Sequence, residues 1–318
     1  MASADKDDDP VPRHRSRRPA AFAIRTVGVV GLGHMGHAFA TNLIQDGYQV
    51  LVHDTDPKRV SELQSAGARG AARLSDLARC DVVLTSLPDD DALAAVALAP
   101  DGLAGILAAN AVHVSMSTIS PMLSERVAED HAGHGQDYVA APVLGNPDFA
   151  RTRQLFVLAA GAPSGLAKVL LLLERLGQRL FVIGDDAASA NLLKLAANVL
   201  TATTLESMGE VLALLGKAGM DRRRGFEVLT NSLFDSRVHK SYGAKIVEGR
   251  YSPPGMAIPL AIKDLRLVLA EAERAAVPMP AASLVHDRLV AMAARGWSDL
   301  DWSALGLLAS IDAGLAGC

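Results

Sequence analysis

The chain has 318 residues, of which half are hydrophobic and 21% are charged, and its formal net charge is -4. This length suits two domains of about 100 to 200 residues each, and the mildly acidic balance excludes nucleic acid as an obvious partner. The two cysteines, Cys80 and Cys318, are too few for a disulfide framework, so we expect a reducing, cytoplasmic setting.

The first 25 residues place aspartates before a cluster of arginines and lack the apolar core of a signal peptide. We expect a disordered tail there, and the alternative is a basic arm for phosphate-rich partners. No later run reaches the roughly 18 uninterrupted apolar residues of a membrane span, so we expect no membrane partner.

From residue 26 to 185, short β-branched runs alternate with helical patterns such as PKRVSELQSAG and SPMLSERVAEDHAG. This alternation is typical of βαβ units around a parallel sheet. The predicted strands are TVGVVG, YQVLVHD, CDVVLTSLP, AVHVSMST, YVAAPVLG, QLFVLAAG and RLFVIG. The sequence therefore predicts an α/β, doubly wound Rossmann-type domain over residues 26–185.

After residue 185 the strand signal almost disappears. Long apolar-periodic segments follow, separated by breaks at KAGMD, YSPPG and VPMP. The junction DDAASA supplies acidic and small residues suited to the start of a helix. We predict an all-α C-terminal domain over residues 186–318, joined to the first domain through a long helix.

The segment VGVVGLGHMG places three glycines as G-x-G-x-x-G directly after a strand and at the start of a helix. Gly31 permits a tight turn, Gly33 a close approach of the backbone to a pyrophosphate, and Gly36 close packing of helix on strand. The exposed N–H groups of the helix then face the phosphates. The candidate dinucleotide loop also contains the intervening residues Leu32, His34 and Met35.

Asp54 ends the second predicted strand, where a carboxylate accepts hydrogen bonds from an adenosine ribose and repels a 2'-phosphate. The sequence therefore favours NAD over NADP. Lys58 and Arg59 follow closely and keep NADP open as the alternative.

Ligands of open α/β sheets lie across the carboxyl ends of the strands. Leu87 and Pro88 follow one predicted strand, and Ser117 and Thr118 follow the next. We expect all four near the ligand, and the hydroxyl pair to donate hydrogen bonds to substrate or ribose. The alternative for Ser117 and Thr118 is the N-cap of the following helix.

One polar stripe interrupts the apolar segment SANLLKLAANVL. Residues three and four apart share a helix face, which aligns Asn191, Lys194, Asn198 and Thr201. We expect the helix to be buried around most of its circumference and the stripe to line an interdomain cleft. A partly desolvated Lys194 suits general acid/base catalysis with Asn198 orienting the substrate oxygen, and a snorkelling lysine is the alternative.

The ordered motifs GLGHMG, SLPDD, STISP, APVLG, NLLKLAAN and KDL resemble the β-hydroxyacid dehydrogenase family, from about residue 26 to 312. The family includes 3-hydroxyisobutyrate dehydrogenase. The resemblance implies an NAD(P)-binding domain, a helical domain of the 6-phosphogluconate dehydrogenase type, and a homodimer or tetramer formed through the helical domain. By this resemblance, Lys194 is the general acid/base and Asn198 is its partner. Ser117 and Gly145 contact the substrate, Thr118 contacts the nicotinamide side, and Lys263 closes over the cofactor.

The chain departs from the family pattern around its substrate-binding residues. Leu144 and Asn146 stand where a serine and a glycine are common, and Met256 replaces a frequent aromatic residue. A carboxylate clamp is therefore not predicted. Arg153, which replaces a glycine, is a candidate anion contact, although a surface role is the favoured interpretation.

The sequence predicts an NAD(P)-dependent oxidoreductase that transfers hydride between nicotinamide and a small 3-hydroxy acid or semialdehyde. Two alternatives remain open, an imine reductase-like enzyme and a non-catalytic dinucleotide-binding protein. No metal site is expected, because His131 and His134 lack accompanying cysteine or acidic ligands. The segment FDSRVHKSYG is expected to be a break between helices, either solvated or on the substrate side.

Overall fold

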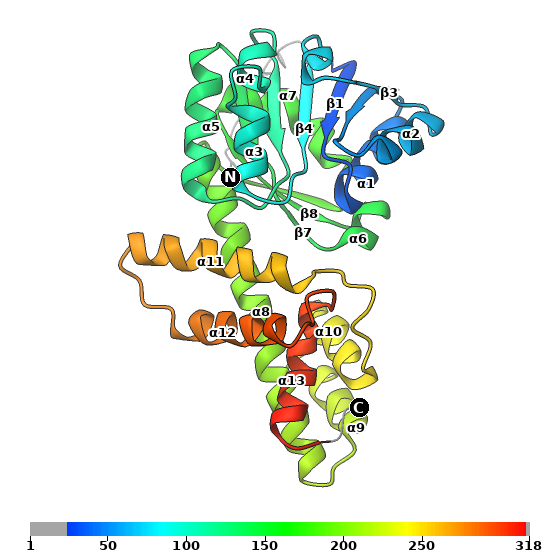
Figure 1. Ribbon diagram of the computed structural model, residues 1–318, viewed down its shortest axis with the longest axis vertical. Coiled ribbons are helices and arrows are strands. Elements are labelled where there is room, and N and C mark those ends of the chain that lie inside the picture. The colour runs from blue at the N-terminus through cyan, green and yellow to red at the C-terminus, as the bar shows by residue number, and fades with distance from the viewer. Residues whose placement is uncertain (1–23, 316–318) are drawn as a thin grey trace, which may run out of the picture.

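The computed structural model describes residues 24–315, which form two parts stacked along the long axis of the molecule (Figure 1). The upper part contains the strands and the lower part is helical. The predicted tail therefore lies almost entirely outside the described residues, as does Cys318.

The upper part is built on one sheet with the order β3-β2-β1-β4-β5-β6-β8-β7, and β9 pairs with β8. The strands are β1 (Thr26–Val30), β2 (Gln49–His53), β3 (Arg69–Gly70), β4 (Val82–Thr85), β5 (Val112–Ser115), β6 (Asp137–Ala140), β7 (Val143–Leu144), β8 (Phe156–Gly161) and β9 (Arg179–Gly184). All seven predicted segments contain strand. The short β3 was not predicted, since only two residues of it pair.

The first six strands pair in parallel, as predicted, but β8 runs antiparallel to both β6 and β7. The segment YVAAPVLG is two strands, β6 and β7, and not one. Only the short helix α6 (Pro147–Arg151) separates β7 from β8. A parallel crossover needs about a dozen residues or more, so this connection favours an antiparallel return.

Helices cover both faces of the sheet (Figure 1). They are α1 (His34–Gln45), α2 (Pro57–Ser65), α3 (Asp90–Ala97), α4 (Leu103–Ile106), α5 (Pro121–Gly133) and α7 (Pro163–Glu174), with a 3-10 turn at Leu74–Leu77. Asp56 and Ser120 begin α2 and α5 by accepting a hydrogen bond from a backbone N–H of the first turn, and each is followed by a proline.

The lower part contains α8 (Ala187–Lys217), α9 (Arg222–Thr230), α10 (Arg237–Glu248), α11 (Ile258–Arg274), α12 (Pro280–Ala294), a 3-10 turn at Trp302–Ala304 and α13 (Leu305–Asp312). The three predicted breaks separate α8 from α9, α10 from α11, and α11 from α12. The expected break at FDSRVHKSYG is wrong beyond Ser236. That serine accepts a hydrogen bond from the N–H of His239 and starts α10 there.

Helix α8 connects the two parts, beginning at an N-cap in which Asp186 accepts from the N–H of Ala188 (Figure 1). By length and composition it is apolar enough to cross a membrane, yet it packs against strands above and helices below, and a connecting core helix meets the same criterion. The expectation that its apolar faces are buried is only partly correct. Leu192 and Leu193 are 43% and 42% exposed, and Leu200 is 70% exposed, because α8 leaves the sheet domain before the other helices surround it.

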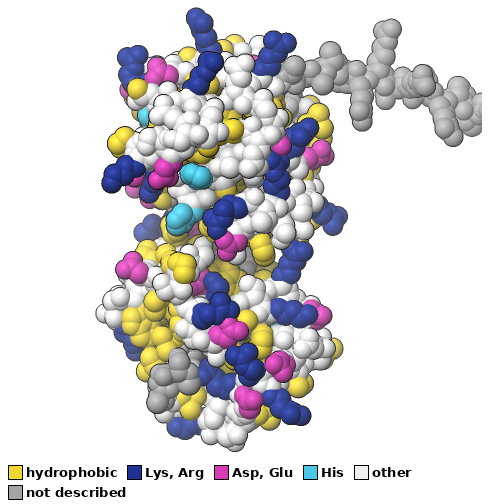
Figure 2. All heavy atoms as spheres, turned by 90° about the vertical axis from the view of Figure 1, so that its right-hand side faces the viewer, with side chains coloured by type: hydrophobic (Ala, Val, Ile, Leu, Met, Phe, Trp, Pro, Cys, Tyr) yellow, Lys and Arg dark blue, Asp and Glu magenta, His cyan; other side chains and the backbone are white. Residues whose placement is uncertain are grey.

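Among the described residues, the buried hydrophobic side chains form four clusters. Three lie around the sheet and its helices and the fourth inside the helical part. Helix α8 supplies Leu195, Val199 and Leu205 to the fourth. In the face drawn in Figure 2, side chains of both charges are interspersed, and hydrophobic side chains gather on the lower half.

Candidate active site

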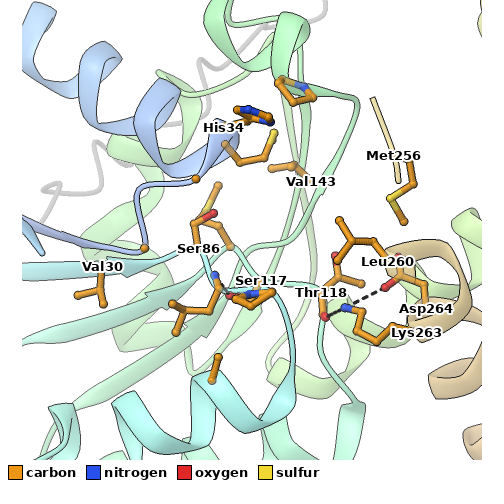
Figure 3. Close-up of a pocket in the computed structure, with 18 of the residues that line it drawn as sticks. Val30, His34, Ser86, Ser117, Thr118, Val143, Met256, Leu260, Lys263 and Asp264 are labelled. Carbon is orange, nitrogen blue, oxygen red and sulfur yellow. Dashed lines mark hydrogen bonds and ion pairs between the residues drawn. The ribbon is translucent and has the colours of Figure 1, made fainter. Parts of the chain in front are cut away.

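A cavity of about 700 Å³ lies where the carboxyl ends of the strands meet the helical part, and both parts contribute to its wall (Figure 3). Of the predicted site residues, the following line it: Gly31, Gly33, His34, Met35, Asp54, Leu87, Pro88, Ser117, Thr118, Gly145, Lys194, Asn198 and Lys263. The remaining two, Leu32 and Gly36, lie behind the wall and shape it.

The glycine-rich turn has room only for backbone at two of its three glycines. Gly31 has a φ of +86°, and an added Cβ would lie 2.4 Å from the carbonyl oxygen of Ser86. At Gly36 an added Cβ would lie 1.9 Å from the carbonyl oxygen of Gly31, so the start of α1 packs directly on the turn. At Gly33, by contrast, an added Cβ would meet no described atom within 4 Å. Gly33 therefore faces open space at the N-terminus of α1, which fits a bound pyrophosphate.

Asp54 ties the end of β2 to the glycine-rich turn. Its Oδ2 accepts from the N–H of Leu32 at 2.6 Å, and its Oδ1 accepts from the N–H of Asp56 at 2.8 Å. Burial acts to raise the pKa of Asp54, but these two hydrogen bonds and the nearby guanidinium of Arg59 lower it overall. Asp54 is thus an ionised acceptor, 3.6 Å from Arg59 Nη1, which also lines the cavity.

The loops after β4 and β5 are held together by Ser117, whose Oγ accepts from the N–H of Leu87 at 2.9 Å (Figure 3). Thr118 offers its carbonyl oxygen to Lys263 Nζ at 2.5 Å, which connects this loop to α11 across the cavity. The alternative that Ser117 or Thr118 caps the next helix is wrong, because Ser120 caps α5.

Of the predicted polar stripe of α8, only Lys194 and Asn198 line the cavity, and Asn191 is buried outside its lining. Asn191 Nδ2 donates to the carbonyl oxygen of Ser117 at 3.4 Å, and Lys194 Nζ donates to Asn198 Oδ1 at 3.1 Å. Thr201 does not line the cavity, since its hydroxyl donates to the carbonyl oxygen of Ala197 one turn earlier.

Asp264 completes this chain of contacts and was not identified from the sequence. Its Oδ2 accepts from Asn198 Nδ2 at 2.5 Å, and Lys263 Nζ lies 2.9 Å from its Oδ1. The Lys194 ammonium can only donate hydrogen bonds and the Asp264 carboxylate can only accept them. Asn198 can therefore bind both only when its amide oxygen faces Lys194 and its amide nitrogen faces Asp264. Within the sequence, only its place in the KDL motif could have pointed to Asp264. Its partner Asn198 is 66 positions away in the chain, so no local pattern indicates their contact.

The position of Lys194 changes its proton affinity. Burial lowers the pKa of its ammonium, the negative charge of Asp264 opposes this shift, and the positive charge of Lys263 adds to it, with a net lowering. The site thus holds an amine whose neutral form is more accessible than that of a solvated lysine.

Arg153 and His131 lie outside the cavity. Arg153 binds Asp46 at 2.8 Å and the carbonyl oxygen of Asn42 at 3.0 Å, so it braces the end of α1 and is not an anion contact. His131 is buried and pairs with His113 at 2.8 Å, and residues 24–315 contain no group of three or more His, Cys, Asp or Glu side chains that could hold a metal ion.

The departures from the family pattern have different positions. Leu144 packs into a hydrophobic cluster and does not line the cavity. Asn146 does line it and also caps α6 by accepting from the N–H of Phe149. Apolar lining residues that sequence reasoning did not place in the site include Val143, Pro147 and Leu260. No local pattern distinguished them from core positions.

Comparison with known families gives matches to both parts of the chain. Residues 26–184 match the NAD binding domain of 6-phosphogluconate dehydrogenase. Residues 188–308 match the NAD-binding domain of NADP-dependent 3-hydroxyisobutyrate dehydrogenase.

Curated relatives cover most of the chain. The uncharacterized oxidoreductase YfjR of Bacillus subtilis is 36% identical over 280 residues, which are 88% of this chain and 98% of that protein. The 3-hydroxyisobutyrate dehydrogenase of Pseudomonas aeruginosa is 31% identical over 288 residues, with 88% and 96% of the two chains covered.

Solved structures share the fold. The 3-hydroxyisobutyrate dehydrogenase of Mycobacterium tuberculosis superposes with a TM-score of 0.81 at 24% identity, covering 89% of this chain and 98% of that one. An imine reductase from Pseudomonas sp. gives 0.57 at 23% identity, covering 92% of this chain and 100% of that one. From the family matches to both parts and the identity shared with full-length relatives, the chain belongs to the β-hydroxyacid dehydrogenase family of NAD(P)-dependent oxidoreductases.

Proposed function

We propose that the protein interconverts a small carbonyl compound and its alcohol, with Lys194 as the general acid/base. The observation that carries this proposal is the contact chain Lys194–Asn198–Asp264 inside the interdomain cavity. A bound NAD(P)H supplies hydride to the carbonyl carbon, and NAD(P)⁺ accepts it in the reverse direction.

In the reducing direction, the ammonium of Lys194 donates a proton to the carbonyl oxygen as that oxygen gains negative charge. In the oxidising direction, the neutral amine takes the hydroxyl proton. Because its pKa is lowered, Lys194 exchanges this proton nearer to neutral pH than a solvated lysine does. General acid/base help of this kind is typically worth ~100 to 10,000-fold in rate.

Asn198 and Asp264 are positioned to orient Lys194. The Asn198 amide oxygen accepts from the ammonium, and the buried Asp264 fixes that amide. We assign Ser117 and the backbone at Gly145 to substrate contacts and Thr118 to the nicotinamide side. Lys263 closes the cavity through its contacts with Thr118 and Asp264.

For the cofactor, we propose NAD in preference to NADP. Asp54 is ionised at the carboxyl end of β2, where it accepts ribose hydroxyls and repels a 2'-phosphate. Arg59 offsets part of this repulsion, so the preference is expected to be moderate. Titrating both reduced cofactors by nicotinamide fluorescence tests it.

We further propose a homo-oligomer formed through the helical part. Large hydrophobic side chains stay exposed along one face of α8, where Leu200 is 70%, Val211 41% and Leu214 67% exposed. Leu284 of α12, which is 53% exposed, lines a surface groove beside Leu214. Light scattering should give a multiple of 33.3 kDa, and Leu214→Glu should reduce the mass. A monomer at micromolar concentration would contradict this assignment.

The cellular location is proposed to be the cytoplasm. Cys80 is a free, buried thiol, and burial raises its pKa to about 12. Such an unreactive thiol requires no oxidising compartment. Fractionation of cells that express the untagged chain tests this placement.

The decisive experiment replaces Lys194 with methionine, which keeps the apolar stem and removes the charge. Turnover should fall by ~100 to 10,000-fold, which corresponds to about 3 to 5 kcal/mol in the barrier, while the Kd for NADH changes little. Lys217→Met on the same helix but outside the cavity is the matched control. Near-normal turnover in the Lys194 variant would refute the role of this lysine.

The substrate panel should include hydroxy acids, aldehydes and imines with both cofactors. Reduction of imines but not carbonyls would favour the imine reductase alternative, whose fold this chain shares. Tight NADH binding without turnover of any compound would favour a non-catalytic protein.

A further inference from the structure

Apolar side chains from both parts of the molecule line the same cavity as Lys194, and we call them the apolar wall. Met256 of the α10–α11 loop and Leu260 of α11 line it on the side of Lys263 and Asp264, and Val143 of β7 lines it from the sheet part (Figure 3). Leu260 is 40% exposed although it is a large hydrophobic residue. Exposed apolar surface inside a cavity is commonly a ligand contact.

The loop that carries Met256 is held in place from behind. Asp301, which has no exposed surface, accepts from the N–H of Gly255 at 2.8 Å and of Met256 at 3.3 Å. Lys245 Nζ lies 2.9 Å from the same carboxylate and neutralises it. The loop that carries Met256 is therefore held in place before a ligand binds. The charges of Lys245 and Asp301 neutralise each other, so neither is left to pair with a ligand.

The charged side chains near the apolar wall can stabilise the negative charge that develops on the reacting oxygen, but not a second negative charge on the substrate. Lys263 is paired with Asp264 at 2.9 Å, which leaves Lys194 as the one cation there, among the described residues, that is matched only by a neutral amide. The single arginine of the described lining, Arg59, is beside Asp54 at the β2 end. Because Lys194 serves the reacting oxygen in the proposed function, a substrate carboxylate would be desolvated beside apolar side chains and near the buried Asp264 without a second cation to pair with.

We propose that this site accepts carbonyl compounds, and the matching alcohols, whose group next to the reacting carbon is uncharged and apolar, and that Met256 and Leu260 select this group. The inference rests on the proposed function. For an aldehyde, hydride from NAD(P)H adds to the carbonyl carbon and the Lys194 ammonium protonates the oxygen. The products are the primary alcohol, NAD(P)⁺ and the neutral amine. Met256 has a flexible thioether that adapts to different chain shapes.

The test compares matched substrates of the intact enzyme with saturating cofactor. Methyl 4-oxobutanoate should exceed 4-oxobutanoate in kcat/KM by at least about tenfold, since only the acid brings a charge to the apolar wall. From butanal to hexanal, kcat/KM should rise about fourfold for each added methylene. A readout without turnover is the binding of hexanamide and hexanoate to the NADH complex, followed by nicotinamide fluorescence, in which the amide should bind more tightly.

Variants of Leu260 identify the selecting surface. Leu260→Arg should raise kcat/KM for 4-oxobutanoate by about tenfold and lower it for hexanal, because a guanidinium pairs with the carboxylate. Leu233→Arg, at a position that is 95% exposed and outside the lining, is the control and should change neither value. Leu260→Ala, which adds no charge, should reduce the rise in kcat/KM for each methylene added between butanal and hexanal.

The outcomes separate the two proposals. A wild-type enzyme that prefers 4-oxobutanoate over its ester, while Lys194→Met is inactive, would overturn the apolar substrate class and leave the proposed function standing. Such a preference would mean that backbone N–H groups near Gly145 hold the carboxylate. If no aldehyde, acid or ester is reduced although NADH binds, both proposals fall.

Discussion

The two glycines at the start of α1 allow packing and cofactor binding to be tested separately. Gly36→Ala puts a Cβ 1.9 Å from the carbonyl oxygen of Gly31, although Cβ contacts under 3.0 Å are essentially never seen. The start of α1 must therefore move by about 1 Å in a tightly packed layer. Gly33→Ala adds the same methyl group where it meets no described atom within 4 Å, at a φ of -61° that alanine adopts readily.

The expected magnitudes differ accordingly. Overpacking costs about 1 to 3 kcal/mol, and each kcal/mol corresponds to about 2 to 4 °C in a domain of this size. Gly36→Ala should therefore lower the melting temperature of the cofactor-free protein by about 2 to 12 °C, whereas Gly33→Ala should change it by about 1 °C or less. Gly33→Ala should still raise the Kd for NADH at least about tenfold, because its methyl group takes the space of the pyrophosphate.

Differential scanning fluorimetry without cofactor and titration of NADH fluorescence measure the two effects independently. We expect a destabilised Gly36→Ala protein and a stable Gly33→Ala protein with weak cofactor binding. Wild-type NADH affinity in Gly33→Ala would refute the placement of the pyrophosphate at the N-terminus of α1. Equal losses of stability in both variants would refute the packing argument.

Four further predictions concern charge. Because burial lowers the pKa of Lys194, kcat/KM for alcohol oxidation should rise with pH and that for carbonyl reduction should fall, and both profiles should be absent in Lys194→Met. Asp264→Asn removes the charge that opposes this lowering, so both profiles should move to lower pH; an unchanged midpoint would contradict the effect of the Asp264 charge on Lys194. Asp54→Ala should weaken NADH more than NADPH, measured as the ratio of the two Kd values, and a constant ratio would exclude selection by Asp54. Burial lowers the pKa of His113 far below 6.5, so below about pH 6.5 only the unfolded state takes up a proton on this residue. The free energy of unfolding, measured with urea, should therefore be fully present above about pH 6.5 and fall by up to about 1.4 kcal/mol per pH unit below it. A free energy of unfolding that does not change with pH would contradict this.

Repeating local patterns made much of the fold predictable from sequence. Short β-branched runs gave the strands because their side chains suit a sheet buried on both faces. The glycine spacing after β1 identified the dinucleotide turn, since each glycine meets a steric requirement that acts within a few residues. Lys194 and Asn198 were paired correctly because one helical turn separates them, and that distance is independent of the rest of the fold.

Contacts between distant segments were decided only by the tertiary structure. The antiparallel direction of β8 is set by its pairing with β6 and β7, and the contact of Asp264 with Asn198 depends on how α11 packs across α8. Met256 joins Leu260 of α11 in the cavity wall because Asp301 anchors the loop before α11 from a segment more than 40 residues further along the chain. Sequence periodicity records which face of an element is apolar, but not what that face contacts. The lysine that we propose as the acid/base was therefore identifiable as a candidate from the sequence alone, whereas the surface that we propose selects the substrate was not.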